Sequence, residues 1–256
     1  MKPSGSGSFI NLIKHLQNFT FLMLDVFRSF GTLKKNRRET LWEMYVIGSQ
    51  ALLLAILGGL FSGVILAIES GHNLEKFGAT LLVSRTVSLG IVRELGPAIC
   101  GILLAARTGA KNTSEIGAMQ LSEQVDALKA YGINPVEKLV LPRVAAAVIM
   151  FLPLTLIADV TGILGGMFIT TTTFNVDLSY FWTTAIKVLE FKDLFVGIMK
   201  PVFFSFFIGM ISCYYGLNTK GGTMNLGKNA ISSVVVSSSV VLMLDFIFTK
   251  VVWEIM

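Results

Sequence analysis

The chain has 256 residues, of which 53% are hydrophobic and only 14% are charged, whereas soluble domains usually carry about a quarter charged residues. The mean hydropathy is +0.71. These values exclude an ordinary soluble domain and indicate a polytopic membrane protein. The net charge of +5 does not indicate nucleic acid, because the Lys and Arg residues fall mostly between apolar runs, which is typical of membrane topology.

No pattern in the sequence predicts a metal site, a hydrolytic centre or a redox centre. Cys100 and Cys213 lie inside apolar runs, and His15 and His72 are isolated, so none of them has neighbours at metal-ligand spacing. The Gly/Ser-rich start lacks a signal-peptide cleavage site. We therefore expect the first span to direct insertion, and we expect no cofactor bound by this chain.

The first 45 residues are predicted to form an interfacial unit beside a permease domain of residues 46–256. Apolar residues recur every three or four positions over residues 9–30, which predicts an amphipathic helix on the membrane surface. A helix packed on the bundle is the alternative. Four basic residues follow and suit an anionic cytoplasmic leaflet: Lys34, Lys35, Arg37 and Arg38.

Five later segments are long enough to cross a hydrocarbon core, which requires roughly 20 apolar helical residues. They cover residues 46–68, 86–106, 144–170, 194–215 and 230–249. Polar loops are predicted at residues 70–84 and 171–193, and a Gly-rich loop at residues 215–229. Two pairs of glycines, Gly59 with Gly63 and Gly162 with Gly166, are spaced for close helix contact. These spans predict an all-α membrane protein. The Lys and Arg residues gather on the same side as the N-terminus, so we expect the N-terminus to be cytoplasmic.

The polar segment between the second and third spans is expected to hold a cytoplasmic coupling helix at about residues 112–131. Asn112 and Glu115 have capping-box spacing. Gly132 suits the end of a helix, and Pro135 suits the first position of the next one. A rigid helix at this place can transmit force from a soluble motor, although a helix that merely connects two spans has the same pattern.

Residues 222–229 nearly match the phosphate-binding pattern G-x-x-x-x-G-K-[ST]. Asn229 stands where a hydroxyl would bind Mg²⁺, and an apolar span precedes the segment where a strand is required. We therefore expect a glycine-rich turn here. Any ATPase that drives the protein must then be another subunit.

Charged residues occur inside four of the five expected spans, where they are costly and usually have partners. Arg93 and Glu94 lie about 12 Å from one end of their span at 1.5 Å per residue. Asp159, Lys200 and Asp245 are predicted to lie at similar depths, so Lys200 should pair with one of the two aspartates. For Arg93 and Glu94, contact with cargo and a structural ion pair both remain open.

Several motifs occur in a fixed order: residues 93–97 (RELGP), 106–109 (ARTG), 115–119 (EIGAM), 123–128 (EQVDAL), 132–135 (GINP), 141–143 (LPR), 215–217 (YGL), 221–222 (GG) and Asp245. Together they resemble the MlaE/YrbE permease family, the membrane subunits of ABC transporters that work with MCE proteins. The resemblance covers roughly residues 10–250, and residues 171–190 and 223–226 depart from it.

This resemblance implies a homodimeric permease of the bacterial inner membrane that exchanges phospholipid or another hydrophobic molecule with a periplasmic MCE carrier. Two cytoplasmic ABC ATPase subunits, which use ATP and Mg²⁺, would bind the coupling helix. The implied ATPase contacts are Glu115, Met119, Glu123, Gln124, Asp126 and Leu128. The implied lipid pocket holds Arg93, Glu94, Leu66, Leu74 and Phe77.

One alternative comes from a different class of protein. An autonomous secondary transporter or channel could use Glu94, Asp159, Lys200 and Asp245 as an ion path. The coupling helix discriminates between the two hypotheses, because a secondary transporter has no use for a docking face at that position. Co-purification with a soluble ATPase would distinguish them directly.

Overall fold

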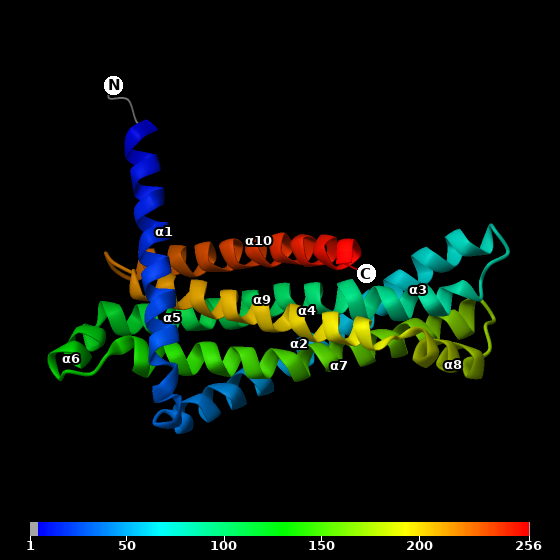
Figure 1. The fold of residues 1–256 in the computed structure, drawn as a ribbon, viewed down its shortest axis with the longest axis horizontal. Helices are drawn as coiled ribbons and strands as arrows, with labels where there is room; N and C mark the ends of the chain where they lie inside the picture. Colours follow the sequence, from blue (N-terminus) through cyan, green and yellow to red (C-terminus); the bar gives the residue numbers. More distant parts are fainter. Residues whose placement is uncertain (1–4, 256) are drawn as a thin grey trace.

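The computed structural model describes the backbone of residues 5–255 and, within that range, the side chains of residues 13–251 and 254. All regular elements in the described range are helical. The chain begins with α1 (Gly5–Arg28) and the short 3₁₀ turn η1 (Ser29–Lys34), which leads into α2 (Arg37–Glu75). Figure 1 shows α1 crossing one end of the bundle, while the other long helices run along it.

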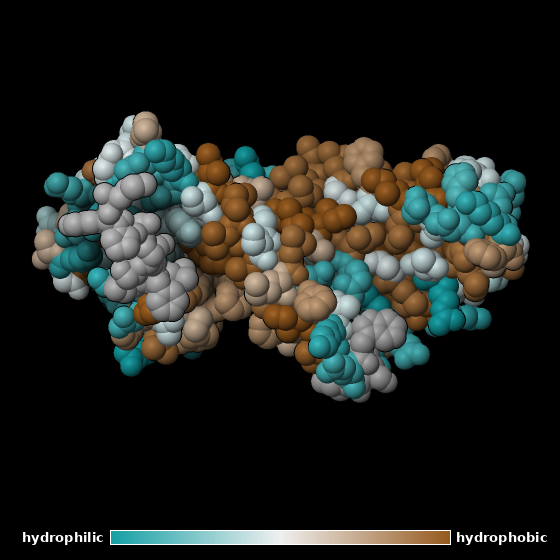
Figure 2. All heavy atoms as spheres, turned by 90° about the horizontal axis from the view of Figure 1, so that it is seen from above, coloured by the Kyte–Doolittle hydropathy of each residue, from teal (hydrophilic) through white to brown (hydrophobic). Residues whose placement is uncertain are grey.

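Five helices are long and apolar enough to cross a membrane, which confirms the predicted number of spans. They cover Arg37–Glu75, Leu82–Leu121, Val136–Thr173, Phe191–Leu217 and Thr223–Val251. Figure 2 shows a broad hydrophobic band between two hydrophilic ends. All five helices exceed their predicted bounds, because helical structure continues into the polar residues at the ends. In particular, most of the predicted loop at residues 70–84 belongs to helices.

The second span is a continuous stack of short elements, with π-helical turns between α-helices. Its elements are α3 (Leu82–Gly90), η2 (Ile91–Leu95), α4 (Gly96–Leu104), η3 (Ala105–Gly109) and α5 (Ala110–Leu121). The third span joins η4 (Val136–Val140) to α7 (Leu141–Thr173). The fourth span is α9 (Phe191–Leu217), and α10 (Thr223–Ile255) contains the fifth.

The predicted helix over residues 112–131 is wrong as a single element. Asn112 does not cap a helix start, because it is fully buried and its side chain contacts Ser212 of α9. The helix of the second span therefore continues through it to Leu121. Glu123 then takes a left-handed conformation with φ +61°, and only the seven-residue α6 (Gln124–Ala130) follows.

The two end signals of that segment were predicted correctly. Gly132 follows α6 with φ +73°, a conformation that glycine adopts without strain. Helical structure resumes at Pro135. The side-chain oxygen of Asn134 accepts a hydrogen bond from the backbone N–H of Val136 at 2.9 Å and so caps this new helix.

Two other loop predictions need correction. The segment 171–193 contains α8 (Leu178–Val188), whose start is capped because Asp177 accepts a hydrogen bond from the N–H of Tyr180 at 3.0 Å. The glycine-rich turn between the last two spans is restricted to residues 218–222, since α10 already begins at Thr223. Gly221 and Gly222 form this turn with φ +83° and +97°.

The core is organised around the close contact of α2 and α7. A Cβ atom on Gly63 would lie 1.8 Å from the carbonyl oxygen of Gly162, and one on Gly59 would lie 2.1 Å from that of Ala158. Gly166 is also restricted, though less severely, because a Cβ atom there would lie 2.5 Å from the side chain of Val87 in α3. The predicted glycine spacing therefore serves backbone contact between the first and third spans.

The α1 helix combines both alternatives that the sequence left open. Leu22 and Val26 are buried against α9, in a cluster that includes Met210 and Tyr214. Several large apolar side chains on α1 remain exposed: Ile13, Leu16, Phe21, Leu24 and Phe27. One face therefore packs on the bundle, and the remaining apolar surface is available to the bilayer interface.

We predict that Gly63→Ala separates α2 from α7 and lowers the free energy of unfolding by about 1–3 kcal/mol, the usual cost of overpacking. Gly227→Ala is the matched control, because Gly227 lies in α10 and a Cβ atom added there would meet no described atom within 4 Å. Thermal unfolding in detergent, followed by size-exclusion chromatography, compares the two. Equal stability of both variants would contradict the close contact.

Candidate functional site

A cluster of charged side chains lies within the membrane-spanning part of the molecule and is centred on Lys200 of α9. The ammonium group lies 2.8 Å from Glu94 Oε2 and 2.8 Å from Asp245 Oδ1. It also donates to Thr249 Oγ1 at 3.0 Å and to the backbone carbonyl of Arg93 at 2.7 Å. Lys200 is completely buried, so these oxygens compensate for its lost hydration.

The backbone of the second span is shaped for this contact. The π-helical turn η2 carries both Arg93 and Glu94, and Pro97 follows in the first turn of α4. Pro97 has no N–H to donate to the carbonyl of Arg93, four residues earlier. Lys200 donates to that oxygen from the neighbouring helix. A helix irregularity inside the membrane is thus satisfied by a side chain of the protein.

A second ion pair connects η2 to the start of α9. The Arg93 guanidinium donates to Asp193 Oδ1, with Nε at 2.7 Å. Asp193 is 2% exposed, and its other oxygen accepts from the N–H of Glu190 at 3.0 Å. The cluster therefore holds two cations, Arg93 and Lys200, against three carboxylates. It ties the second, fourth and fifth spans together.

The cluster is open on the side of Glu94. The Glu94 side chain is 38% exposed, whereas Lys200 is 0% and Asp245 is 18% exposed. Thr249 donates to both carboxylate oxygens of Glu94 at 3.0 Å, so the position of that carboxylate is fixed from α10. A ligand or a neighbouring subunit can therefore reach Glu94 without disturbing the buried lysine.

The predicted pairing of Lys200 with an intramembrane aspartate is confirmed for Asp245 only. Asp159 lies apart, against Gly96, where a Cβ atom would come within 1.7 Å of its Oδ1. That oxygen has no hydrogen-bond partner among the residues that the structure describes. Asp159 therefore does not take part in the same charge cluster.

The apolar residues predicted for the lipid pocket do not lie beside the Glu94 cluster. Leu66 and Leu74 pack in a cluster with Val87 and Ile91 of the second span. Phe77 is 84% exposed in the loop after α2. Glu94, in contrast, faces α9 and α10. Within one chain, the polar and apolar residues of the predicted pocket thus lie on different sides of the second span.

A second ion-pair network lies at the α6 end of the bundle. Glu43 of α2 accepts from Lys111 at 2.8 Å and lies 3.2 Å from Arg143. Arg143 also binds Glu115 at 3.0 Å. Glu115, predicted as an ATPase contact, therefore forms an ion pair with a residue of its own chain. The network joins α2, α5 and α7.

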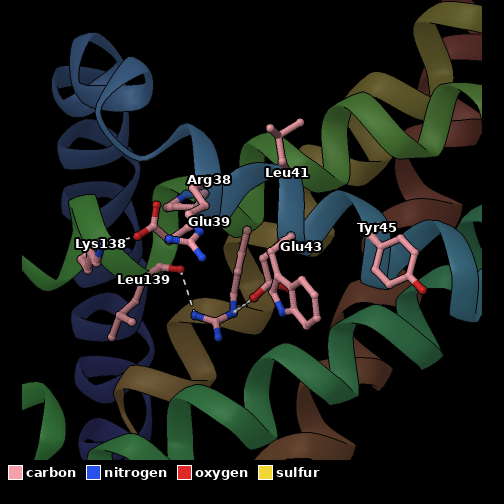
Figure 3. A pocket seen from close by; sticks show the side chains of 10 residues that line it. Arg38, Glu39, Leu41, Glu43, Tyr45, Lys138 and Leu139 are labelled. Atoms are coloured by element: carbon pink, nitrogen blue, oxygen red, sulfur yellow. Dashed lines mark hydrogen bonds and ion pairs between the residues drawn. The ribbon is translucent and has the colours of Figure 1, made fainter.

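A cavity of about 800 Å³ adjoins this network between the starts of α2 and α7. Figure 3 shows Glu39 paired with Lys138 on its lining, and Glu43 beside the guanidinium group with which it pairs, that of Arg143. Trp42 and Tyr45 also line it and are both exposed. Because each of the two acids has a basic partner, the network fixes the relative position of the two helices at this end.

The other residues predicted to contact an ATPase lie at or near α6. Glu123, Gln124 and Asp126 are exposed, and Met119 and Leu128 are partly buried. Asp126 forms an ion pair with Lys129 at 2.7 Å.

Sequence reasoning missed two exposed apolar side chains directly after α6. Tyr131 is 83% exposed and Ile133 is 43% exposed. They flank Gly132, and apolar residues on both sides of a turn glycine are the signal that could have identified them.

Among the described residues, no group of three His, Cys, Asp or Glu side chains is placed to hold a metal ion.

Comparison with known proteins identifies the family. The family model described as "Permease MlaE" matches residues 40–251. A probable ABC transporter permease protein of Rickettsia typhi is 34% identical over 213 residues, covering 83% of this chain and 82% of the relative. One of Synechocystis is 29% identical over 255 residues, covering 99% of this chain and 97% of the relative.

A third relative carries a more specific name. The intermembrane phospholipid transport system permease protein MlaE of Haemophilus influenzae is 29% identical over 245 residues, covering 95% of this chain and 94% of the relative. The five spans and the charge cluster occupy the region that the family model matches. The chain therefore belongs to the MlaE permease family and is a non-catalytic membrane subunit of an ABC transporter.

Proposed function

We propose that this permease moves phospholipid between the bacterial inner membrane and a periplasmic MCE-domain carrier, as a homodimer driven by two ABC ATPase subunits. The half-open charge cluster around Glu94 is the observation that carries the proposal, because Lys200 and Thr249 hold this carboxylate in place while 38% of its side chain stays exposed to a ligand. The name of the Haemophilus influenzae relative supports phospholipid as the cargo. ATP and Mg²⁺ are used by the partner ATPase.

The distribution of basic residues supports a cytoplasmic N-terminus. Lys34, Lys35, Arg37 and Arg38 follow α1 at the α6 end of the bundle, and Lys111, Lys129, Lys138, Lys220 and Lys228 belong to elements that meet there. The opposite end, beyond α3 and α8, has fewer Lys and Arg residues. By the positive-inside rule, the α6 end faces the cytoplasm and the α8 end faces the MCE partner.

The α6 end has the features of an ATPase dock. The short α6 helix exposes polar side chains, and Tyr131 and Ile133 add exposed apolar area beside it. Aromatic anchors of this kind contribute most of the affinity in many protein interfaces. Movement imposed on α6 would reach the spans through α5, which is continuous with the second span and tied to α2 and α7 by the Glu43 network.

A homodimer would complete the cargo site. Only 17% of the apolar stretch of α10 is buried, against 33% to 61% in the other four spans. A second copy packed along α10 would cover this surface and bring the open side of each Glu94 cluster to a shared cavity. Membership in a family of ABC transporter permeases favours this ATP-driven mechanism over an autonomous ion-coupled transporter.

We predict that Leu128→Asp releases the ATPase while the permease stays inserted and dimeric. Loss of an apolar interface anchor costs about 2 kcal/mol or more, which corresponds to about 30-fold in affinity. The amount of ATPase that co-purifies with the permease measures the effect.

The control for this variant is Leu81→Asp, which puts the same change on an exposed leucine at the opposite end of the bundle. It should retain the ATPase at the wild-type level. Undiminished co-purification with Leu128→Asp would show that α6 is not the dock.

We also predict that Glu94→Lys reduces lipid transfer at least about tenfold, because the fully buried Lys200 loses a carboxylate partner and the new ammonium group repels it. Glu94→Gln should be milder, since it keeps the shape and the hydrogen bond to Thr249. Transfer is measured in proteoliposomes that contain the complete complex.

Glu75→Lys is the matched charge reversal, because Glu75 is exposed and forms no ion pair with a described side chain. ATPase co-purification should be unchanged in all three variants, which separates a cargo defect from a docking defect. Wild-type transfer by Glu94→Lys would restrict Glu94 to a structural role.

A further inference from the structure

A second cavity, of about 640 Å³, lies where η1, α2 and α7 meet. It is separate from the Glu94 cluster, and Leu41 divides it from the cavity of Figure 3 because this side chain lines both. Its lining is apolar apart from Thr40 and two cations, Lys34 and Arg37. None of the described side chains that line it is a carboxylate.

The two cations are exposed and carry charge that the described chain leaves unpaired. Neither Lys34 nor Arg37 forms an ion pair with any side chain that the structure describes. In the neighbouring cavity, Lys138 and Arg143 are paired with acids, and only Arg38 of its three described cations is not. The charge of Lys34 and Arg37 is therefore available to an anion from outside the chain.

The apolar part of the cavity extends from these cations along the spanning helix. Arg37, Leu41 and Met44 recur at helical spacing on one face of α2, and Met44 lies about 10 Å further along the axis than Arg37. Ile149 of α7, which is 45% exposed, completes the apolar side. Lys34 and Arg37 thus lie at one end of an apolar groove that runs along the membrane-spanning direction.

The site is built on a fixed part of the backbone. The Asn36 side chain donates to the carbonyl of Glu137 at 2.8 Å, and Thr40 donates to the carbonyl of Asn36 at 3.1 Å. Thr32 closes η1 by donating to the carbonyl of Ser29 at 2.7 Å. The turn between α1 and α2 is therefore held against η4 and keeps both cations in place.

From this arrangement we propose that the cavity binds one anionic phospholipid of the leaflet at the α6 end. Lys34 and Arg37 hold the phosphate group, and one acyl chain lies along Leu41, Met44 and Ile149. Basic pockets beside membrane spans attract anionic head groups, and the apolar groove distinguishes a lipid from a soluble anion. This resident lipid would be distinct from the transported one, and the proposal does not depend on the identity of the cargo.

The test uses the purified permease complex, delipidated in detergent and titrated with phosphatidylglycerol or phosphatidylcholine, with bound lipid counted by native mass spectrometry. The double variant Lys34→Gln/Arg37→Gln should lose one tightly bound phosphatidylglycerol, with affinity lowered about 30-fold, because each cation near the surface contributes roughly a factor of five. Phosphatidylcholine binding should not change.

Two further variants make the result specific. Arg28→Gln/Lys35→Gln removes the same charge from exposed positions at the same end that do not line the cavity, and it should keep the lipid. Ile149→Trp fills the groove and should displace the lipid while both cations remain. Equal loss in the two double variants would show only a diffuse charge effect and would overturn the proposal.

Two other occupants are also distinguished. If millimolar inorganic phosphate displaced the lipid and Ile149→Trp did not change lipid binding, the cavity would be a simple anion site. That result would contradict the proposal. Loss of phosphatidylglycerol binding whenever the ATPase is attached would assign the cavity to the protein partner instead. Retention of the lipid in the complete complex supports the proposal.

Discussion

Lys200 is fully buried inside a membrane-spanning helix, where an ammonium group without partners would be severely destabilising. Glu94, Asp245, Thr249 and the carbonyl of Arg93 surround it. These partners come from the second and fifth spans, so their positions relative to α9 follow from this one charge. Removing one partner of such a group typically costs about 3–5 kcal/mol, which makes the cluster a strong constraint on how these three spans pack.

The remainder of the bundle is held in a different way. The first and third spans meet through backbone contacts at Gly63 and Gly162, and the Glu43 network fixes their ends. The molecule thus combines a tightly packed helix pair with a group of three spans joined by charges. The second span contacts both, and its π-helical turns are local irregularities at which such a helix can bend. In the proposed mechanism, force from α6 enters along this span.

Hydropathy predicted the five spans because the hydrocarbon core imposes a length on any crossing helix. It could not predict their ends, which depend on tertiary contacts such as that of Asn112 with Ser212. For the same reason, the sequence predicted one coupling helix where the left-handed conformation of Glu123 separates two helices. It also predicted a loop in the segment that contains α8. The pairing of Lys200 with Asp245 followed from the cost of burying a charge. A structural ion pair was left open for Glu94, but Lys200 was not predicted as its partner, because depth in the membrane does not show that the turn η2 directs Glu94 toward α9.

In the proposed mechanism, ATP hydrolysis by the partner subunit moves phospholipid through a site beside Glu94. Native mass spectrometry of the purified complex, before and after addition of ATP and Mg²⁺, tests this mechanism directly. We expect the complex to retain phospholipid without nucleotide, and we expect turnover to release one population while the lipid bound at Lys34 and Arg37 stays behind. A complex whose bound phospholipid is the same before and after turnover would contradict the mechanism.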